Sequence, residues 1–173
     1  MDVELSRGGE AAEQAIRNLF TAYFYEMSAW DPGILMNEYG LPVWHESEGV
    51  PRTPEEQVEG NWWIRDRCAR YAIRAGGAAV GFALVCEDPS LLPYEVPHGT
   101  DFEVLDFYVA PKVRRSGVGA RAAALVLERH RGNGVLLTLA ANAGAQAFWR
   151  AALATGARDV VEHDGGTMFT FRS

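Results

Sequence analysis

The chain has 173 residues, of which 48% are hydrophobic and 23% charged, so its composition is that of a globular protein that can bury a core without disulfides or metal. Its formal net charge of −7 argues against a nucleic-acid partner, because a general nucleic-acid binder usually carries a basic surface. No apolar run approaches the roughly 18 residues that a membrane span needs, and the acidic start MDVELSRGGE differs from a secretory signal. We therefore expect a cytoplasmic protein with no membrane partner.

The first third of the chain predicts one long helix followed by an irregular region. A short strand is expected at 3–5, and apolar residues at helical spacing predict an amphipathic helix over 10–27. Four prolines interrupt residues 31–66, so we expect short helices and loops there. The aromatic residues expected to pack this region are Trp30, Trp44, Trp62 and Trp63.

From residue 69 the pattern changes to strands. RYAIRAGGAAVGFALVCED contains two β-rich runs joined by Gly76 and Gly77, a dipeptide that suits a two-residue hairpin turn. A further strand is expected in DFEVLDFYVAP, where Pro111 ends it. An alanine-rich helix follows, and then a short apolar strand at 135–140 that suits burial on both faces.

The C-terminal part predicts a helix and a hairpin. In NAGAQAFWRAALATGA, Asn142 is positioned to cap a helix and Gly156 to end it. The last residues predict a hairpin that turns at 164–166. The complete order of elements predicts a mixed α/β sheet with helices on its faces.

Only two cysteines occur, Cys68 and Cys86, and they have neither metal-ligand spacing nor a histidine nearby. We expect both to be thiols in core or surface positions. The sequence therefore predicts neither a disulfide framework nor a metal site.

Charge is distributed unevenly along the chain. Residues 1–66 carry thirteen Asp and Glu against four Arg, a formal charge of −9, whereas residues 67–173 carry ten against twelve Arg and Lys, a charge of +2. The two parts suit ligands of different charge, and the alternative is that the first is simply a solvated acidic surface.

The segment FYVAPKVRRSGVGARAAALVLERH runs from a strand through a basic turn into a helix. Gly117 and Gly119 allow the backbone to approach a ligand closely, and the first N–H groups of a helix lack an intrahelical partner. With Lys112, Arg114 and Arg115 beside it, the turn predicts a phosphate site, for which a simple helix entry is the alternative. It is neither a P-loop, since no Lys-Ser or Lys-Thr follows, nor a dinucleotide fingerprint, since no acidic residue lies about 20 residues on.

Two motifs, one within residues 109–120 and the other at Asn142, Ala145, Phe148 and Trp149, together resemble the GNAT N-acetyltransferase superfamily. The second one, Asn142-x-x-Ala145-x-x-Phe148-Trp149, looks like the superfamily's Asn-x-x-Ala-x-x-Phe-Tyr segment. The similarity is specific over about 69–156 and weak before that. The first motif resembles the acyl-CoA pyrophosphate loop and comprises Val109, Pro111, Arg114, Gly117, Gly119 and Ala120.

The resemblance implies a GNAT fold, in which one mixed sheet of about seven strands is splayed between strand 4, ending at Val109, and strand 5, with helices on both faces. It also implies a single acetyltransferase domain over 1–173. Within that domain, about 1–66 would shape the acceptor site, about 69–156 would bind acyl-CoA, and about 157–173 would form the C-terminal hairpin.

The same resemblance implies acetyl-CoA as co-substrate and places its parts. The pantetheine arm would lie in the splay and pair with backbone groups of Tyr108 and Val109, whose N–H is the family's usual oxyanion donor. Asn142 would contact the pantetheine amide and Phe148 would flank the cofactor; the alternatives are helix capping and core packing. The turn residues implied in pyrophosphate binding are Arg114, Arg115, Ser116, Gly117, Val118, Gly119 and Ala120.

Glu103 and Asp106 are the candidate general bases. Strict alternation along the strand places Glu103 and Val109 on one face and Asp106 on the other, so only one carboxylate would face the thioester unless a bulge intervenes. Glu103 lies six residues before Val109, where several family members place a base, so we favour it over Asp106. A water relay and His98 are the alternatives.

The general acid is unassigned by sequence, because Trp149 stands where the family often has a tyrosine that protonates the thiolate. An indole N–H is not a practical proton source. A thiol pKa of about 8.5 makes thiolate departure feasible without an acid, and Tyr94 or Tyr108 would serve if the fold brought one close.

The sequence thus predicts an N-acetyltransferase that moves acetyl from acetyl-CoA to a primary amine, by direct transfer in a ternary complex. The acidic first part favours a small cationic acceptor. The alternatives are an acyl-CoA-binding module with little catalysis and an enzyme that acetylates a protein or peptide amine. A homodimer is compatible with the sequence, which does not specify the oligomeric state.

Overall fold

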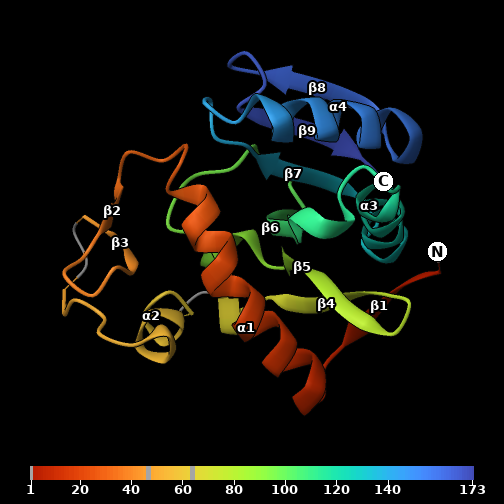
Figure 1. Cartoon of the computed structure of the whole chain (residues 1–173). Coiled ribbons are helices and arrows are strands. Elements are labelled where there is room, and N and C mark those ends of the chain that lie inside the picture. Colours follow the sequence, from red (N-terminus) through yellow and green to blue (C-terminus); the bar gives the residue numbers. More distant parts are fainter. Residues whose placement is uncertain (1, 46–47, 63–64) are drawn as a thin grey trace.

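The structure, a computed structural model, describes residues 2–45, 48–62 and 65–173 and is built around a seven-stranded sheet (Figure 1). The strand order is β1-β4-β5-β6-β7-β9-β8; β6 and β7 are parallel and the other neighbours are antiparallel. This confirms the predicted mixed sheet. The strands are β1 (Val3–Arg7), β4 (Ala69–Ala75), β5 (Ala78–Cys86), β6 (Phe102–Val109), β7 (Asn133–Leu137), β8 (Arg158–His163) and β9 (Met168–Arg172).

Helices cover both faces of the sheet, because the side chains of its central strands alternate between two cores. In β5, Ala83 and Val85 join the core that includes residues of α3 and α4, whereas Phe82 and Leu84 join the core that includes α1 and α2. The α-helices in the described part of the chain are α1 (Glu10–Met27), α2 (Pro54–Gly60), α3 (Val118–Arg129) and α4 (Ala143–Gly156).

The long helix α1 has the bounds that the sequence predicts. Its apolar stripe buries Ile16, Phe20 and Phe24 completely against the sheet. Burial of one such side chain stabilises the fold by roughly 1.5–3 kcal/mol. The stripe therefore fixes which face α1 presents to β4 and β5.

The region that follows α1 contains a small hairpin that the sequence did not predict. Strands β2 (Ile34–Met36) and β3 (Pro42–Trp44) pair with each other, and each is only three residues long, so they carry too little alternation to be recognised. The predicted aromatic packing is present at two positions: Trp62 is buried against Phe20, and Trp44 packs on Phe24. Trp63 lies outside the described residues.

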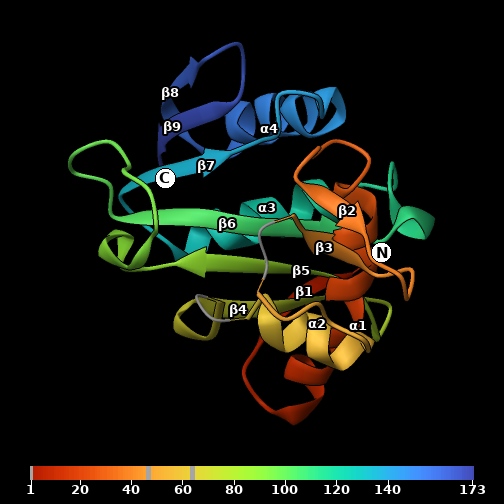
Figure 2. The ribbon, with the colours of Figure 1, turned by 90° about the vertical axis from the view of Figure 1, so that its left-hand side faces the viewer.

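The predicted splay lies between β6 and β7. The two strands pair only where Phe102–Val104 meets Gly134–Leu136, whereas β6 pairs with β5 as far as Val109. Beyond Val104, β7 leaves β6 at an angle (Figure 2). The β7-facing edge of the second half of β6 therefore has no strand partner among the described residues.

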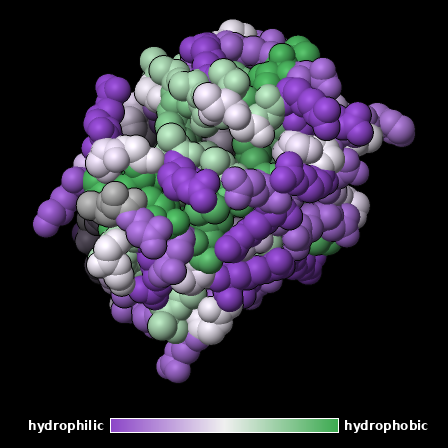
Figure 3. Space-filling model, turned by 90° about the vertical axis from the view of Figure 1, so that its right-hand side faces the viewer, coloured by the Kyte–Doolittle hydropathy of each residue, from purple (hydrophilic) through white to green (hydrophobic). Residues whose placement is uncertain are grey.

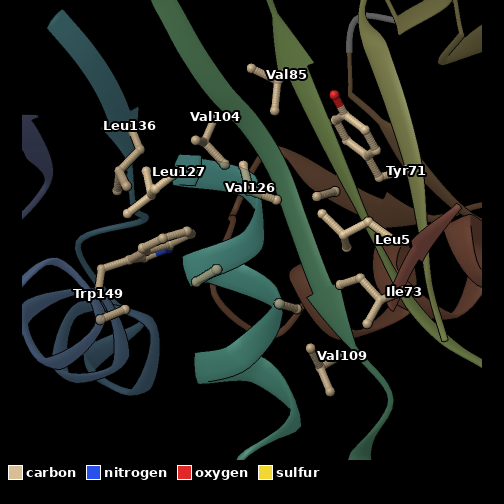
Figure 4. Packing of buried hydrophobic residues seen from close by; sticks show 14 of the residues in the cluster. Leu5, Tyr71, Ile73, Val85, Val104, Val109, Val126, Leu127, Leu136 and Trp149 are labelled. Atoms are coloured by element: carbon tan, nitrogen blue, oxygen red, sulfur yellow. The ribbon is translucent and has the colours of Figure 1, made fainter. Parts of the chain in front are cut away.

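Helices α3 and α4 pack on the face of the sheet next to this gap and share a hydrophobic core with the central strands. Figure 4 shows Trp149 projecting from α4 toward α3, with Val109 at the end of β6. Trp149 is 6% exposed and packs on the ring of Phe107 at 5.1 Å between ring centroids. Trp149 is therefore a core residue.

The outer surface is mixed. Hydrophilic residues predominate on the face toward the right of Figure 1, with hydrophobic groups between them (Figure 3). Within the described ranges, none of the helices combines the length and apolar character required to cross a membrane. Cys68 and Cys86 are both buried, as expected for core thiols.

Candidate active site

The glycine turn lies at the start of α3 and leaves backbone exposed. Gly117 is the residue before the helix and has a φ of 84°, a left-handed conformation that glycine adopts without strain. No side chain caps it, and the first turn of α3 contains no acidic residue. The N–H groups of that turn thus remain available to an anion, and the positive end of the helix dipole favours one.

Two side chains of the turn, Arg114 and Ser116, form hydrogen bonds within the protein. Arg114 donates from Nε to the Val109 carbonyl oxygen at 2.7 Å and from its terminal nitrogen to Glu26 of α1 at 2.6 Å. Arg115 is exposed with a φ of 64°, and Ser116 donates its hydroxyl proton to the Val113 carbonyl. Arg114 therefore ties the turn to α1 and to the end of β6.

Gly119 lies where α3 passes close to α4. A Cβ at this position would lie 3.2 Å from the ring of Phe148, so any larger residue would have to displace that ring. Phe148 in turn stacks on Phe107 with 5.5 Å between ring centroids. The packing expected as the alternative role of Phe148 is thus present, beside the β6 segment whose β7-facing edge has no strand partner among the described residues.

Asn142 caps α4, since its side-chain oxygen accepts a hydrogen bond from the Ala145 N–H at 2.9 Å. This is the alternative role expected for Asn142, and the amide nitrogen of the side chain does not take part in that bond.

The side chain of Tyr108 lies on the α1 side of the sheet, where its hydroxyl donates to Glu26 at 3.1 Å. Burial, and next the charge of Glu26, raise the pKa of Tyr108 to about 12.

The two candidate bases lie on the same face of the sheet, so the prediction of strict alternation is wrong. The pairing register between β5 and β6 shifts between Leu84 and Val85, which leaves Leu105 as the extra residue of a β-bulge. The bulge moves every later side chain to the opposite face. Glu103 and Asp106 consequently both lie on the α1 side, whereas Phe107 belongs to the other core.

Glu103 is almost completely enclosed, with 1% of its surface exposed. Both carboxylate oxygens accept from the Tyr94 hydroxyl, at 3.0 and 3.1 Å. Burial raises the pKa of Glu103 to about 7; the Tyr94 hydrogen bond opposes this rise and the charge of Asp106 adds to it. A carboxyl that titrates near neutrality is matched to proton transfer at neutral pH.

Asp106 is held in an ion pair instead. It accepts from Arg65 Nε at 2.8 Å and from the Tyr23 hydroxyl at 2.7 Å. Both carboxylate oxygens are therefore engaged by neighbouring groups. The third candidate, His98, lines a separate cavity together with residues of β7, β8 and β9.

A cavity of ≈ 430 Å³ lies on the α1 side of the bulge. Tyr94 and Leu105 form the part of its wall nearest to Glu103, which is itself not among the lining residues. Glu48 and Arg65 are the charged residues in the described lining. The complete described lining is Val43, Trp44, Glu48, Gly49, Pro51, Gly60, Asn61, Arg65, Pro93, Tyr94 and Leu105.

Three groups at this site have no motif in the sequence. Arg65 and Glu26 lie 41 and 88 residues from the partners that they bind, Asp106 and Arg114. The role of Tyr94 as the partner of Glu103 depends on how the loop before β6 folds back. An alignment of related chains in which such pairs vary together is the signal that could identify them.

A parallel pair of strands that separates beside a glycine turn, at the start of the following helix, is the arrangement of the acetyltransferase class. Residues 14–153 match the family described as the acetyltransferase (GNAT) family, and the chain belongs to this family. The family normally uses acetyl-CoA as co-substrate, so the protein is placed among the acyltransferases. A comparison with curated protein sequences gives no match.

Solved structures of acetyltransferases are similar over nearly the whole chain. A histone acetyltransferase HPA2 and related acetyltransferase from Corynebacterium glutamicum has a TM-score of 0.67 and 14% identity, covering 99% of this chain and 96% of that one. An acetyltransferase from Thermus thermophilus has a TM-score of 0.58 and 18% identity, with 99% and 96% coverage. An N-acetyltransferase from Staphylococcus aureus has a TM-score of 0.56 and 14% identity, with 99% and 97% coverage. At these identities the similarity shows the fold alone.

Proposed function

We propose that the protein is an acetyl-CoA-dependent N-acetyltransferase that acetylates a primary amine by direct transfer in a ternary complex. The observation that carries the proposal is the free edge of β6, which has an exposed glycine turn at one end and a buried carboxyl of raised pKa at the other. An extended pantetheine arm fits such an edge by adding backbone hydrogen bonds.

On the cofactor side, the backbone provides most of the contacts. The N–H groups from Arg115 to Ala120 bind the pyrophosphate, and backbone groups of Tyr108 and Val109 bind the pantetheine arm. The amide nitrogen of Asn142 and the ring of Phe148 border the arm. The exposed turn and its left-handed Gly117 support this assignment, because a side chain there would occupy the space of the phosphates.

In the transfer step, the amine nitrogen attacks the thioester carbonyl carbon and a C–N bond forms. The C–S bond breaks, the CoA thiolate leaves with the electron pair, and the proton of the amine goes to Glu103. The Val109 N–H stabilises the oxyanion. Trp149 supplies no proton, so the thiolate is protonated from water or from a tyrosine after it leaves.

The acceptor is a small cationic amine bound in the cavity beside the bulge. The formal charge of −9 in residues 1–66 supports a cationic ligand, and Glu48 brings one carboxylate of that region to the cavity wall. Trp44 and Tyr94 add aromatic faces, which attract cations at short range. The acceptor-shaping part, the acyl-CoA core and the C-terminal hairpin work here as one domain over 1–173.

The test is a thiol-release assay with acetyl-CoA and a panel of amines, with mass spectrometry of the products. The proposal expects thiol release that depends on an amine and a product heavier by one acetyl group. Binding of acetyl-CoA without amine-dependent release in any broad panel would support a binding module instead. Release that requires a peptide amine would replace the small acceptor with a protein one.

A further inference from the structure

Tyr94 and Leu105 lie between the candidate base and the cavity, and of these two side chains it is Tyr94 that bonds to Glu103. Glu103 is 1% exposed, and it does not appear among the described residues that line the cavity. Tyr94 is 41% exposed, lines the cavity and places its hydroxyl 3.0 Å from Glu103. An amine in the cavity therefore meets the Tyr94 hydroxyl before it meets the Glu103 carboxylate.

The loop that carries Tyr94 is anchored by the residues that precede it. Asp88 accepts from the Ser90 N–H and hydroxyl, which caps the short 3-10 helix η2 (Pro89–Leu91). Leu92 is buried in the core beneath α1. The ring of Tyr94 is thus attached to a fixed segment, and the hydroxyl reaches both oxygens of Glu103 from it.

We propose that the Tyr94 hydroxyl is a catalytic proton relay, which accepts the proton of the acceptor amine and passes its own proton to Glu103. The inference rests on the proposed N-acetyltransferase function and specifies how the enclosed base reaches its substrate. No other described residue both lines the cavity and bonds to Glu103.

The two proton transfers of the relay are concerted, so no tyrosinate forms. As the C–N bond forms, the amine proton moves to the Tyr94 oxygen while the Tyr94 proton moves to a Glu103 oxygen. Tyr94 ends as a neutral phenol, Glu103 as a carboxylic acid, and the thiolate carries the electron pair of the broken C–S bond. The proton on Glu103 later returns to solvent. Burial and the charge of Glu103 raise the pKa of Tyr94, so the hydroxyl stays protonated between turnovers.

The relay makes a specific prediction for the pH profile. The groups that face Glu103 are Tyr94, Asp106 with its partner Arg65, and Cys86 of β5. Of these, Tyr94 lowers the pKa of Glu103 through its hydrogen bond and Asp106 raises it. Removal of the Tyr94 hydroxyl therefore raises the pKa of Glu103, and the acid limb of kcat/KM moves to higher pH.

The experiment compares Tyr94→Phe, Glu103→Gln and the double variant with the best amine of the panel at saturating acetyl-CoA. Tyr39→Phe is the matched control, because Tyr39 is also exposed and lies outside the described cavity lining. We expect Tyr94→Phe to lower kcat by about 10²-fold, the lower end for general acid–base catalysis, with the Kd for acetyl-CoA, measured separately by calorimetry, unchanged. The acid limb moves upward, and the double variant is no slower than Glu103→Gln.

The outcomes separate the relay from the proposed function. Loss of activity in Glu103→Gln with a normal rate and pH profile in Tyr94→Phe overturns the relay and leaves the base in place. A lower rate in Tyr94→Phe with an unmoved acid limb also overturns it, because a structural role alone gives that result. A normal rate in Glu103→Gln overturns the base assignment itself. In the wild type, a single-turnover proton inventory must be curved, and a linear one contradicts a two-proton relay.

Discussion

The cofactor side and the acceptor side of the candidate site are built differently. The glycine turn, the end of β6 and the start of α3 are close together in the sequence, and the backbone of the turn and of the β6 edge beyond the β7 pairing is the proposed source of the cofactor-binding groups. The proposed acceptor cavity is lined by residues of β3, α2, the loop before β6 and the bulge of β6, and its described lining includes the charged side chains of Glu48 and Arg65. Substitutions should therefore act through backbone geometry on one side and through individual charges on the other.

The two carboxylates on β6 also differ in their surroundings. Glu103 is enclosed with one hydroxyl donor and has no ion pair in the described part of the chain, whereas Asp106 is saturated by Arg65 and Tyr23. The bulge thus places two acids on one face of the sheet in different surroundings.

The largest expected effect is on Glu103→Gln, which keeps the shape of the side chain but removes its capacity to accept a proton. We expect kcat to fall by about 10²- to 10⁴-fold with the Kd for acetyl-CoA unchanged.

Asp106→Asn instead leaves Arg65 without its carboxylate partner and should lower the free energy of unfolding by about 3 kcal/mol or more. Steady-state kinetics and urea unfolding measure the two. Normal turnover in Glu103→Gln, with a loss in folded Asp106→Asn, would transfer the role of base to Asp106.

Glu103→Gln, which should lower kcat, should raise the free energy of unfolding. The pKa of Glu103 is about 7 in the folded protein and about 4.3 in an unfolded chain. Between these values the folded state binds more protons, so stability falls as the pH rises through this window. Glu103→Gln removes the cost of the buried charge and should be more stable than wild type above pH 7, by on the order of 3–4 kcal/mol.

That difference should become small near pH 4 and vanish below it, where the folded and unfolded states both carry a neutral carboxyl. Urea unfolding at pH 4.5, 6 and 8 measures it. Equal stability of the two proteins at pH 8 would mean that Glu103 is not charged in a buried site and would weaken its assignment as the base.

The sequence predicted the cofactor side of the site better than the cavity side. The turn at Gly117 was predictable because its conformation depends on local stereochemistry, and α1 because its apolar stripe is continuous. The bulge at Leu105 was not, since alternation along one strand contains no information about the register of its partner. The contacts of Tyr94 and Arg65 depend on loops that return from distant positions, so no local pattern specifies them.

A smaller effect is expected on the cofactor side from Gly117→Asp. An aspartate in a left-handed conformation is strained by roughly 1–2 kcal/mol, and its charge repels the pyrophosphate. We expect the Kd for acetyl-CoA, measured by calorimetry, to rise about tenfold or more. Gly8→Asp is the matched control, because Gly8 has a φ of 71° in equally open surroundings but lies between β1 and α1. Unchanged affinity in a folded Gly117→Asp protein would remove the turn from the cofactor site.

The smallest expected effect tests whether charge guides the acceptor. Glu48 is the acidic residue of the described cavity lining, and attraction between exposed charges at about 4 Å in water is worth about 1 kcal/mol, which corresponds to roughly fivefold. Because salt screens this attraction, kcat/KM of the wild type for the best amine should fall as ionic strength rises. Glu48→Gln should lower kcat/KM by about two- to fivefold at low salt and make it less dependent on salt. Glu4→Gln, at an exposed position of the edge strand β1, should leave both unchanged. If the best acceptor is neutral or anionic, or if Glu48→Gln responds to salt as the wild type does, the acidic first part of the chain is only a solvated surface, and the acceptor is selected by the shape and apolar walls of the cavity.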